Sequence, residues 1–190
     1  MDKKFKFENK SHLESNIRKR LLPARKTLLK LGLNKGDAIA DIGSGTGYFT
    51  FSAAKIVGKG NTVYALDIST DMLSVIENKV LEEKISNIKT IVVTEDSFDI
   101  DSDTIDFAFI CSVLHEIDNL DLTLKEIKRI IKTSGKLAII EWKKIKSNFG
   151  PPINHRLEPL VIINKLHKIG FKKIEQSDIN NYLYSITCFK

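Results

Sequence analysis

Ala38–Thr50 reads AIADIGSGTGYFT, and the organisation of the chain follows from this stretch. A short apolar run ends at Asp41, glycines follow at Gly43, Gly45 and Gly47, and an apolar helical pattern begins at once. This order is typical of a strand, a tight turn and a helix, because glycine permits positive φ and lets the backbone approach a ligand closely. The loop is therefore predicted to bind a ligand.

The charge at the loop indicates which kind of ligand it binds. A dinucleotide loop has the spacing G-x-G-x-x-G, but the third glycine position here is Tyr48. Asp41 at the end of the strand would repel a phosphate and attract a cation. We expect a cationic ligand, although Asp41 could instead cap a helix and the glycines could form a bare turn.

The Asp-x-Gly-x-Gly-x-Gly pattern resembles the class I methyltransferases that use S-adenosylmethionine, whose ligand carries an ammonium and a sulfonium. Within that class, the chain looks like small enzymes related to the ubiquinone and menaquinone C-methyltransferases. This likeness covers nearly the whole chain and extends to Leu22-Pro23, Leu31-Gly32-Leu33, Gly36-Asp37, Val113–Ile117, Gly150-Pro151-Pro152 and His155-Arg156-Leu157.

The order of apolar segments predicts an α/β fold. The residues favour strands at 38–42, 62–66, 88–93, 105–110 and 136–142. They favour helices at about 47–57, from Ser69 to Val80, from Asp118 through Ile131 with a stop at Gly135, and at 157–169. Two short helices precede Pro23 and Gly32, and segments 171–177 and 182–189 form an antiparallel hairpin. The resemblance implies a three-layer Rossmann-like sandwich with a seven-stranded, mostly parallel sheet and an antiparallel last strand.

Length and composition support a single globular unit with an N-terminal extension. The chain has 190 residues, of which 42% are hydrophobic and 28% are charged. We expect residues 1–36 to form an N-terminal helical segment, with residues 2–16 as a lid over the ligand. Residues 37–190 are expected to form the S-adenosylmethionine-binding domain.

Composition also disfavours several function classes. The net charge of +6 is spread along the chain, so a nucleic-acid-binding face is conceivable, but no arginine-rich tract supports it. Cys111 and Cys188 form no C-x-x-C pair, which argues against a zinc site or a disulfide framework. No apolar run approaches the roughly 18 residues of a membrane span, and Met1–Lys4 lacks the core of a signal peptide. A cytoplasmic protein is expected.

Side chains that follow neighbouring parallel strands should converge on one crevice beyond the carboxyl ends of the sheet. The resemblance implies that Asp41 binds the amino group of the methionine moiety, directly or through water. Asp67, at the end of the second strand, is placed to accept both ribose hydroxyls, unless it only caps the next helix. The resemblance adds cofactor contacts from Ser44, Ile68, Met72 and Cys111.

The segment Thr94–Ser97 follows the third strand. The resemblance implies that an acidic side chain here accepts a hydrogen bond from the adenine amino group. Glu95 matches that acid approximately, and Asp96 competes with it; the alternative is an ordinary solvated loop. Asp99, Asp101 and Asp103 alternate as in a calcium loop, but Thr104 and Ile110 replace its glycine and glutamate, so no metal is expected.

The segment Cys111–Glu116 lacks the Asn- or Asp-Pro-Pro-Tyr motif of enzymes that methylate base amino groups. His115 is interpreted as lining the acceptor pocket or as a general base, and otherwise as a packed structural histidine. A Cys111–His115 hydrolase pair is disfavoured because Cys111 ends an apolar strand. Further acceptor-pocket candidates are Glu141, His155 and Arg156, the last of which could instead be a surface residue.

The sequence therefore predicts an S-adenosylmethionine-dependent methyltransferase that acts on a small molecule. One rival is a nucleotide- or NAD-binding Rossmann protein, with Asp67 on the ribose of NAD. Another is a module that binds S-adenosylmethionine without catalysis. The sequence leaves the acceptor, the methylated atom and the oligomeric state open.

Overall fold

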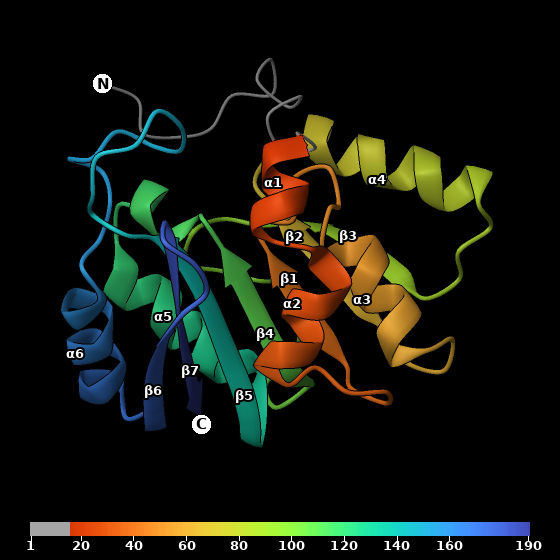
Figure 1. The fold of residues 1–190 in the computed structure, drawn as a ribbon. Coiled ribbons are helices and arrows are strands. Elements are labelled where there is room, and N and C mark those ends of the chain that lie inside the picture. The colour runs from red at the N-terminus through yellow and green to blue at the C-terminus, as the bar shows by residue number, and fades with distance from the viewer. Residues whose placement is uncertain (1–15) are drawn as a thin grey trace.

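The computed structural model describes residues 16–190 (Figure 1). The expected lid, residues 2–16, lies outside the described residues except for Asn16. The helices are α1 (Asn16–Leu21), α2 (Ala24–Leu31), α3 (Thr50–Val57), α4 (Thr70–Glu82), the short 3-10 helix η2 (Leu114–Glu116), α5 (Leu120–Ile130) and α6 (Pro159–Ile169). The strands are β1 (Ile39–Ile42), β2 (Val63–Asp67), β3 (Ile88–Val92), β4 (Ile105–Cys111), β5 (Ile131–Trp142), β6 (Lys172–Asp178) and β7 (Leu183–Phe189).

The strands form one seven-stranded sheet in the order β3-β2-β1-β4-β5-β7-β6. The pairs β3–β2, β2–β1, β1–β4 and β4–β5 are parallel, whereas β7 runs antiparallel to both β5 and β6. The strand order reverses between β1 and β4, which is where open α/β sheets bind their ligands. The predicted sheet and its antiparallel last strand are confirmed.

Helices cover both faces of the sheet, so the molecule has three layers (Figure 1). Alternate strand residues belong to opposite cores: Ile39 packs with α2, α3 and α4, while Ala40 packs with α5 and α6. The central strands are buried on both faces, which explains their nearly continuous apolar sequences. The predicted three-layer sandwich is confirmed.

The boundary between α5 and β5 differs from the prediction. The sequence predicts a helix that stops at Gly135, but β5 already begins at Ile131 and Gly135 lies within the strand. The pairing of β4 with β5 shifts register between Ile105 and Phe107. A Cβ atom on Gly135 would lie 3.0 Å from the Ile105 carbonyl oxygen. The glycine therefore lets β4 and β5 approach each other closely, and it does not terminate a helix.

Smaller differences occur at three helix starts. Asn119, and not Asp118, caps α5, since its Oδ1 accepts the Leu122 N–H at 3.2 Å. Helix α3 begins at Thr50 because the glycine turn continues beyond Gly47, and α6 begins at Pro159. None of these changes moves a predicted strand.

The N-terminal helices pack against the sheet domain. Leu22, Leu28 and Leu31 are buried in the same core as α3. The Tyr48 hydroxyl donates to the Leu22 carbonyl oxygen at 2.8 Å, and the Asn180 side-chain amide donates to the Leu21 carbonyl oxygen at 3.0 Å. The end of α1 is thereby fixed to the glycine loop and to the turn between β6 and β7. Within residues 16–190, every helix is too short or too polar to cross a bilayer.

Candidate active site

A cavity of about 310 Å³ lies beyond the carboxyl ends of β1, β2, β3 and β4. Several of the residues predicted to bind the cofactor line it: Gly43, Ser44, Gly45, Asp67, Ile68, Met72, Glu95 and Cys111. The sheet topology thus brings together residues that are up to 68 positions apart, as Gly43 and Cys111 are (111 − 43). Asp41, Gly47 and Asp96 do not line the cavity.

The glycines of the loop adopt positive φ values of 69° at Gly43, 54° at Gly45 and 88° at Gly47. A Cβ atom on Gly43 would overlap the Cγ2 atom of Val113, a residue that also lines the cavity. Both the backbone conformation and the space therefore require glycine at position 43. The glycine loop and the segment after β4 therefore lie in close contact beside the cavity.

Two hydroxyl groups in the same loop lack a partner. Ser44 Oγ and Thr46 Oγ1 are buried and form no hydrogen bond with any described residue. Buried polar atoms are normally paired, so these two fit a polar ligand in the adjoining cavity. Ser44 was among the predicted residues, whereas Thr46 was missed, although its position inside the glycine loop was a usable signal.

Asp41 is buried behind the loop. Its Oδ2 accepts a 2.6 Å hydrogen bond from the Thr50 hydroxyl. Burial raises the pKa of Asp41 to about 6, although the Thr50 bond and the charge of Arg18 act in the opposite direction. Because Asp41 does not line the cavity, its position favours the water-mediated contact over the direct one.

Asp67 ties the glycine loop to the start of α4. Its Oδ2 accepts the Gly45 N–H at 2.8 Å and its Oδ1 accepts the Ser69 N–H at 2.9 Å. Ser69, not Asp67, caps α4, since Ser69 Oγ accepts the Met72 N–H at 3.3 Å. Burial raises the pKa of Asp67. Each carboxylate oxygen keeps a second lone pair for a ligand hydroxyl.

The structure separates the two acids that compete after β3. Glu95 lines the cavity, and its Oε2 accepts the Asp118 N–H at 3.0 Å. Asp96 is exposed, and its Oδ1 accepts the Thr94 hydroxyl at 2.9 Å. Glu95 is therefore the acid placed to meet a ligand, whereas Asp96 stabilises the turn.

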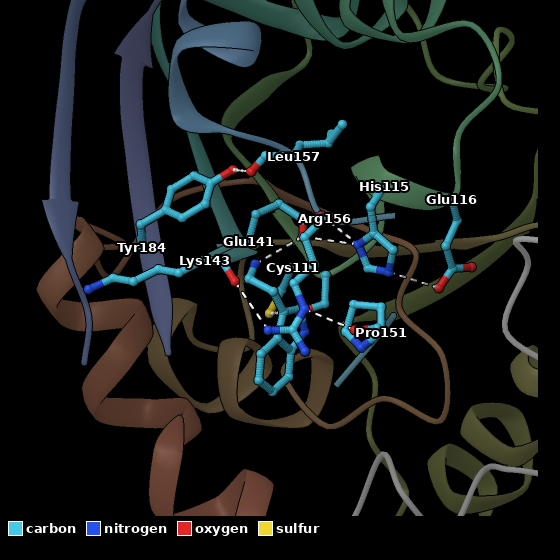
Figure 2. Close-up of polar contacts among 11 residues, drawn as sticks. Cys111, His115, Glu116, Glu141, Lys143, Pro151, Arg156, Leu157 and Tyr184 are labelled. Atoms are coloured by element: carbon cyan, nitrogen blue, oxygen red, sulfur yellow. Dashed lines mark hydrogen bonds and ion pairs between the residues drawn. The ribbon is translucent and has the colours of Figure 1, made fainter. Parts of the chain in front are cut away.

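His115 lies between two glutamates (Figure 2). Its Nδ1 is 3.0 Å from Oε2 and 3.1 Å from Oε1 of Glu141, which is completely buried. Its Nε2 is 3.7 Å from Oε1 of Glu116, a residue that lines the cavity. Burial lowers the pKa of His115, but the hydrogen bond and charge of Glu141, with the charge of Glu116, outweigh burial and leave that pKa raised.

A second hollow of about 320 Å³ adjoins the cavity. His115 and His155 both line it, together with Asn154 and Lys165. Ile117 lines both spaces and so forms part of the wall between them. Glu141 borders neither space; its carboxylate lies beside the His115 ring and its Oε2 also accepts the Trp142 N–H at 3.1 Å. Of the predicted acceptor residues, His115 and His155 are thus brought together.

Arg156 is buried, and its five N–H groups are all directed at oxygen atoms of the preceding segment Lys143–Pro151, here called the linker. Its guanidinium also lies 5.4 Å from the centre of the Trp142 ring. The acceptors are the carbonyl oxygens of Lys143, Ile145, Phe149 and Pro151 and the hydroxyl of Ser147, at 2.8 to 3.2 Å. This geometry indicates that Arg156 holds the linker in place and does not favour the predicted contact with an anionic substrate. The burial of Arg156 also differs from the alternative of a surface residue.

Several cavity-lining residues were missed from the sequence. Arg18 was noted only within a basic cluster, and no local pattern connects it to the glycine loop 25 residues later (43 − 18). Besides Thr46, the other missed residues are Ile42, Tyr48, Ser69, Val93, Thr94, Phe98, Ser112, Val113, Glu116, Ile117 and Thr123. Among the described residues, no group of three or more His, Cys, Asp or Glu side chains is arranged to hold a metal ion.

Comparison with known proteins adds two kinds of similarity. A family model described as the ubiE/COQ5 methyltransferase family matches residues 15–152. A demethylmenaquinone methyltransferase of Geobacillus sp. is 29% identical over 140 residues, which is 74% of this chain and 60% of that protein. A ubiquinone/menaquinone biosynthesis C-methyltransferase UbiE of Hydrogenovibrio crunogenus is 29% identical over 154 residues, which is 80% of this chain and 58% of that protein.

The chain therefore spans about 60% of the length of these two relatives. Among solved structures, a SAM-dependent methyltransferase from Aquifex aeolicus superposes with a TM-score of 0.92 and 27% sequence identity. That match covers 98% of this chain and 99% of the other. The similarity thus extends over the whole sheet.

Proposed function

This chain belongs to the ubiE/COQ5 methyltransferase family, and we propose that it transfers a methyl group from S-adenosyl-L-methionine to a quinone-type small molecule. The observation that carries the proposal is the cavity at the switch point of the sheet, whose glycine loop holds two buried hydroxyls without partners. A polar ligand of nucleoside size is suited to such a space.

The cofactor residues have distinct proposed roles. Asp67 accepts the ribose hydroxyls, Glu95 accepts from the adenine amino group, and Ser44 and Thr46 bind polar groups beside the loop. Asp41 attracts the ammonium group from behind the loop, through water. These roles are supported by the cavity lining and by the charges of Asp67 and Glu95. When bound, S-adenosylmethionine supplies an electrophilic methyl group.

The acceptor is proposed from the names of the relatives, which are methyltransferases of demethylmenaquinone and of ubiquinone and menaquinone biosynthesis. The hollow beyond Ile117 supports a ring-shaped acceptor, because Leu114 and Leu157 line it beside His115 and His155. Residues 2–16, within the N-terminal segment 1–36, are proposed to form a lid over the ligand. Arg156 is proposed to shape the acceptor side by holding the segment Lys143–Pro151.

Methylation of a ring carbon requires a base. The ring carbon forms a bond to the methyl group as the sulfur–carbon bond breaks, and it then loses its own proton. Glu116 lines the cavity and lies beside His115 Nε2, so these two groups are proposed to accept that proton. Glu141 orients His115 from behind and acts as a positioning residue.

Calorimetry with S-adenosylmethionine, S-adenosylhomocysteine and NAD tests the cofactor proposal. We expect binding of the first two and none of NAD; the opposite preference would support the dinucleotide alternative. Methyl transfer from labelled S-adenosylmethionine to a short-chain demethylnaphthohydroquinone then tests catalysis. Cofactor binding without transfer to this or other phenolic rings would favour a non-catalytic module.

A further inference from the structure

Arg18 in α1 borders the cofactor cavity and is held there by neighbouring structure. Its guanidinium carbon lies 5.2 Å from the centre of the Tyr48 ring and 5.6 Å from that of Phe49. These two rings pack edge to face, and Phe49 packs in the same way against Phe109 in β4. The guanidinium therefore lies over aromatic groups that belong to the core.

The position of α1 is also fixed by hydrogen bonds. The backbone carbonyl oxygens of Leu21 and Leu22, three and four residues after Arg18, accept hydrogen bonds from Asn180 and Tyr48, respectively. Arg18 is thus attached to a helix end that contacts the glycine loop itself. A displacement of this helix end would therefore also displace Tyr48, which lines the cavity.

The charges around the cavity make Arg18 distinctive. Among the cavity-lining residues that the structure describes, Arg18 is the one lysine or arginine, whereas Asp67, Glu95 and Glu116 are acidic. The charge of Arg18 also reaches the groups next to the cavity, since it opposes the rise in the pKa of Asp41 and of Cys111 that burial causes. The Arg18 end of the cavity is therefore the end that suits an anionic group.

The ligand of the proposed function carries one such group. The amino acid part of S-adenosylmethionine has a carboxylate, which the acidic residues around the cavity would repel. Arginine matches a carboxylate with two parallel N–H donors, and it can do so while stacked on an aromatic ring. We propose that Arg18 binds the carboxylate of the methionine moiety and so couples α1 to the cofactor. This assignment rests on the proposed function.

Calorimetry on the full chain with three probes tests the assignment. The probes are S-adenosylmethionine, decarboxylated S-adenosylmethionine and 5′-methylthioadenosine, of which only the first has a carboxylate. Arg18→Gln should weaken binding of S-adenosylmethionine about 10- to 100-fold, the range of a charge-assisted hydrogen bond. It should change binding of the other two probes by less than about 3-fold. Arg20→Gln, an exposed change on the same helix, should leave all three affinities unchanged.

The other outcomes are equally informative. If Arg18→Gln weakens all three probes alike, Arg18 acts by packing α1 and the carboxylate assignment is wrong. If it weakens none, Arg18 takes no part in binding. Both results would leave the proposed function intact. If the unmodified chain binds none of the adenosyl probes, the proposed function and the assignment fall together.

Discussion

Glu141 and His115 form a buried pair in which both carboxylate oxygens lie within 3.1 Å of one ring nitrogen, Nδ1. A carboxylate without solvent exposure is costly unless it is paired, so this arrangement is supported by the histidine in front of it. Since Nδ1 faces Glu141, Nε2 is the nitrogen nearer to Glu116, a residue that lines the cavity. The pair thereby links the core at the end of β5 to the site.

Replacement of Glu141 by glutamine should lower the pKa of His115. In the native protein this pKa is raised because the bond and charge of Glu141 outweigh burial; without that charge, burial dominates. A raised histidine pKa stabilises the fold below the unfolded value of about 6.5, and this stabilisation is lost as the pH rises through the folded pKa. The unfolding free energy lost in Glu141→Gln should therefore be largest below about pH 6.5, at about 1 to 3 kcal/mol. It should become smaller as the pH rises through the raised pKa of His115 in the native protein.

Histidine ring NMR and urea unfolding across this pH range provide the measurements. Glu175→Gln, an exposed change on β6, is the matched control and should leave both the His115 titration and the stability curve in place. A Glu141→Gln protein with an unchanged His115 titration would show that the two side chains are not coupled in solution.

Asp41→Asn should stabilise the ligand-free protein at neutral pH. Burial raises the pKa of Asp41 from 3.8 to about 6, so the folded state binds a proton more tightly than the unfolded state. The native protein therefore loses stability as the pH rises through this interval, by up to about 3 kcal/mol. Asparagine carries no charge at position 41, so the variant should lack this loss.

Urea unfolding at about pH 4.5 and about pH 7.5 measures the effect. The stability of Asp41→Asn relative to the native protein should increase between these two pH values, while affinity for S-adenosylmethionine falls. Asp99→Asn, which changes an exposed aspartate, should show neither trend. A constant stability difference at both pH values would mean that Asp41 titrates as it does in an unfolded chain.

The fold and the loop could be predicted because their signals are local. Glycines with positive φ, an acid at a strand end and continuous apolar strands each appear within about ten residues, and parallel topology then places Asp67 beside Gly45. Arg18 and Arg156 could not be placed in this way. The environment of Arg18 depends on how α1 packs against Tyr48, and that of Arg156 depends on how the linker folds around its guanidinium. No spacing in the sequence encodes either kind of tertiary packing.

The competition between Glu95 and Asp96 shows the same limit. Both acids follow the same strand, and only the turn geometry decides which one faces the cavity. Asp96 is occupied by the hydroxyl of Thr94, two residues away, whereas Glu95 reaches the backbone of Asp118 across the cavity edge. A contact between residues 23 positions apart has no signature in the local sequence.

Asp67→Asn should weaken binding of S-adenosylmethionine by about 1.5 to 3 kcal/mol, because one charged acceptor for the ribose hydroxyls is lost. Asparagine keeps a single carbonyl oxygen, so it can retain the bond from Ser69 or from Gly45 but not both. Calorimetry gives the affinity, and Asp71→Asn, an exposed change in the first turn of α4, is the control. An unchanged affinity in Asp67→Asn would remove Asp67 from the cofactor site.

Gly135→Ala should destabilise the fold by about 1 to 3 kcal/mol through overpacking. The added Cβ would lie 2.9 Å from the Lys132 carbonyl oxygen and 3.0 Å from that of Ile105, and neither backbone atom can move without disturbing the β4–β5 pairing. Gly60→Ala is a matched control, because a Cβ there has no atom within 4 Å and neither glycine has positive φ. Its effect should lie between zero and a gain of about 1 kcal/mol, since alanine restricts the unfolded chain. Urea unfolding gives the unfolding free energies of both variants. Equal values would mean that β4 and β5 can move apart at Gly135 to accommodate a methyl group at little cost.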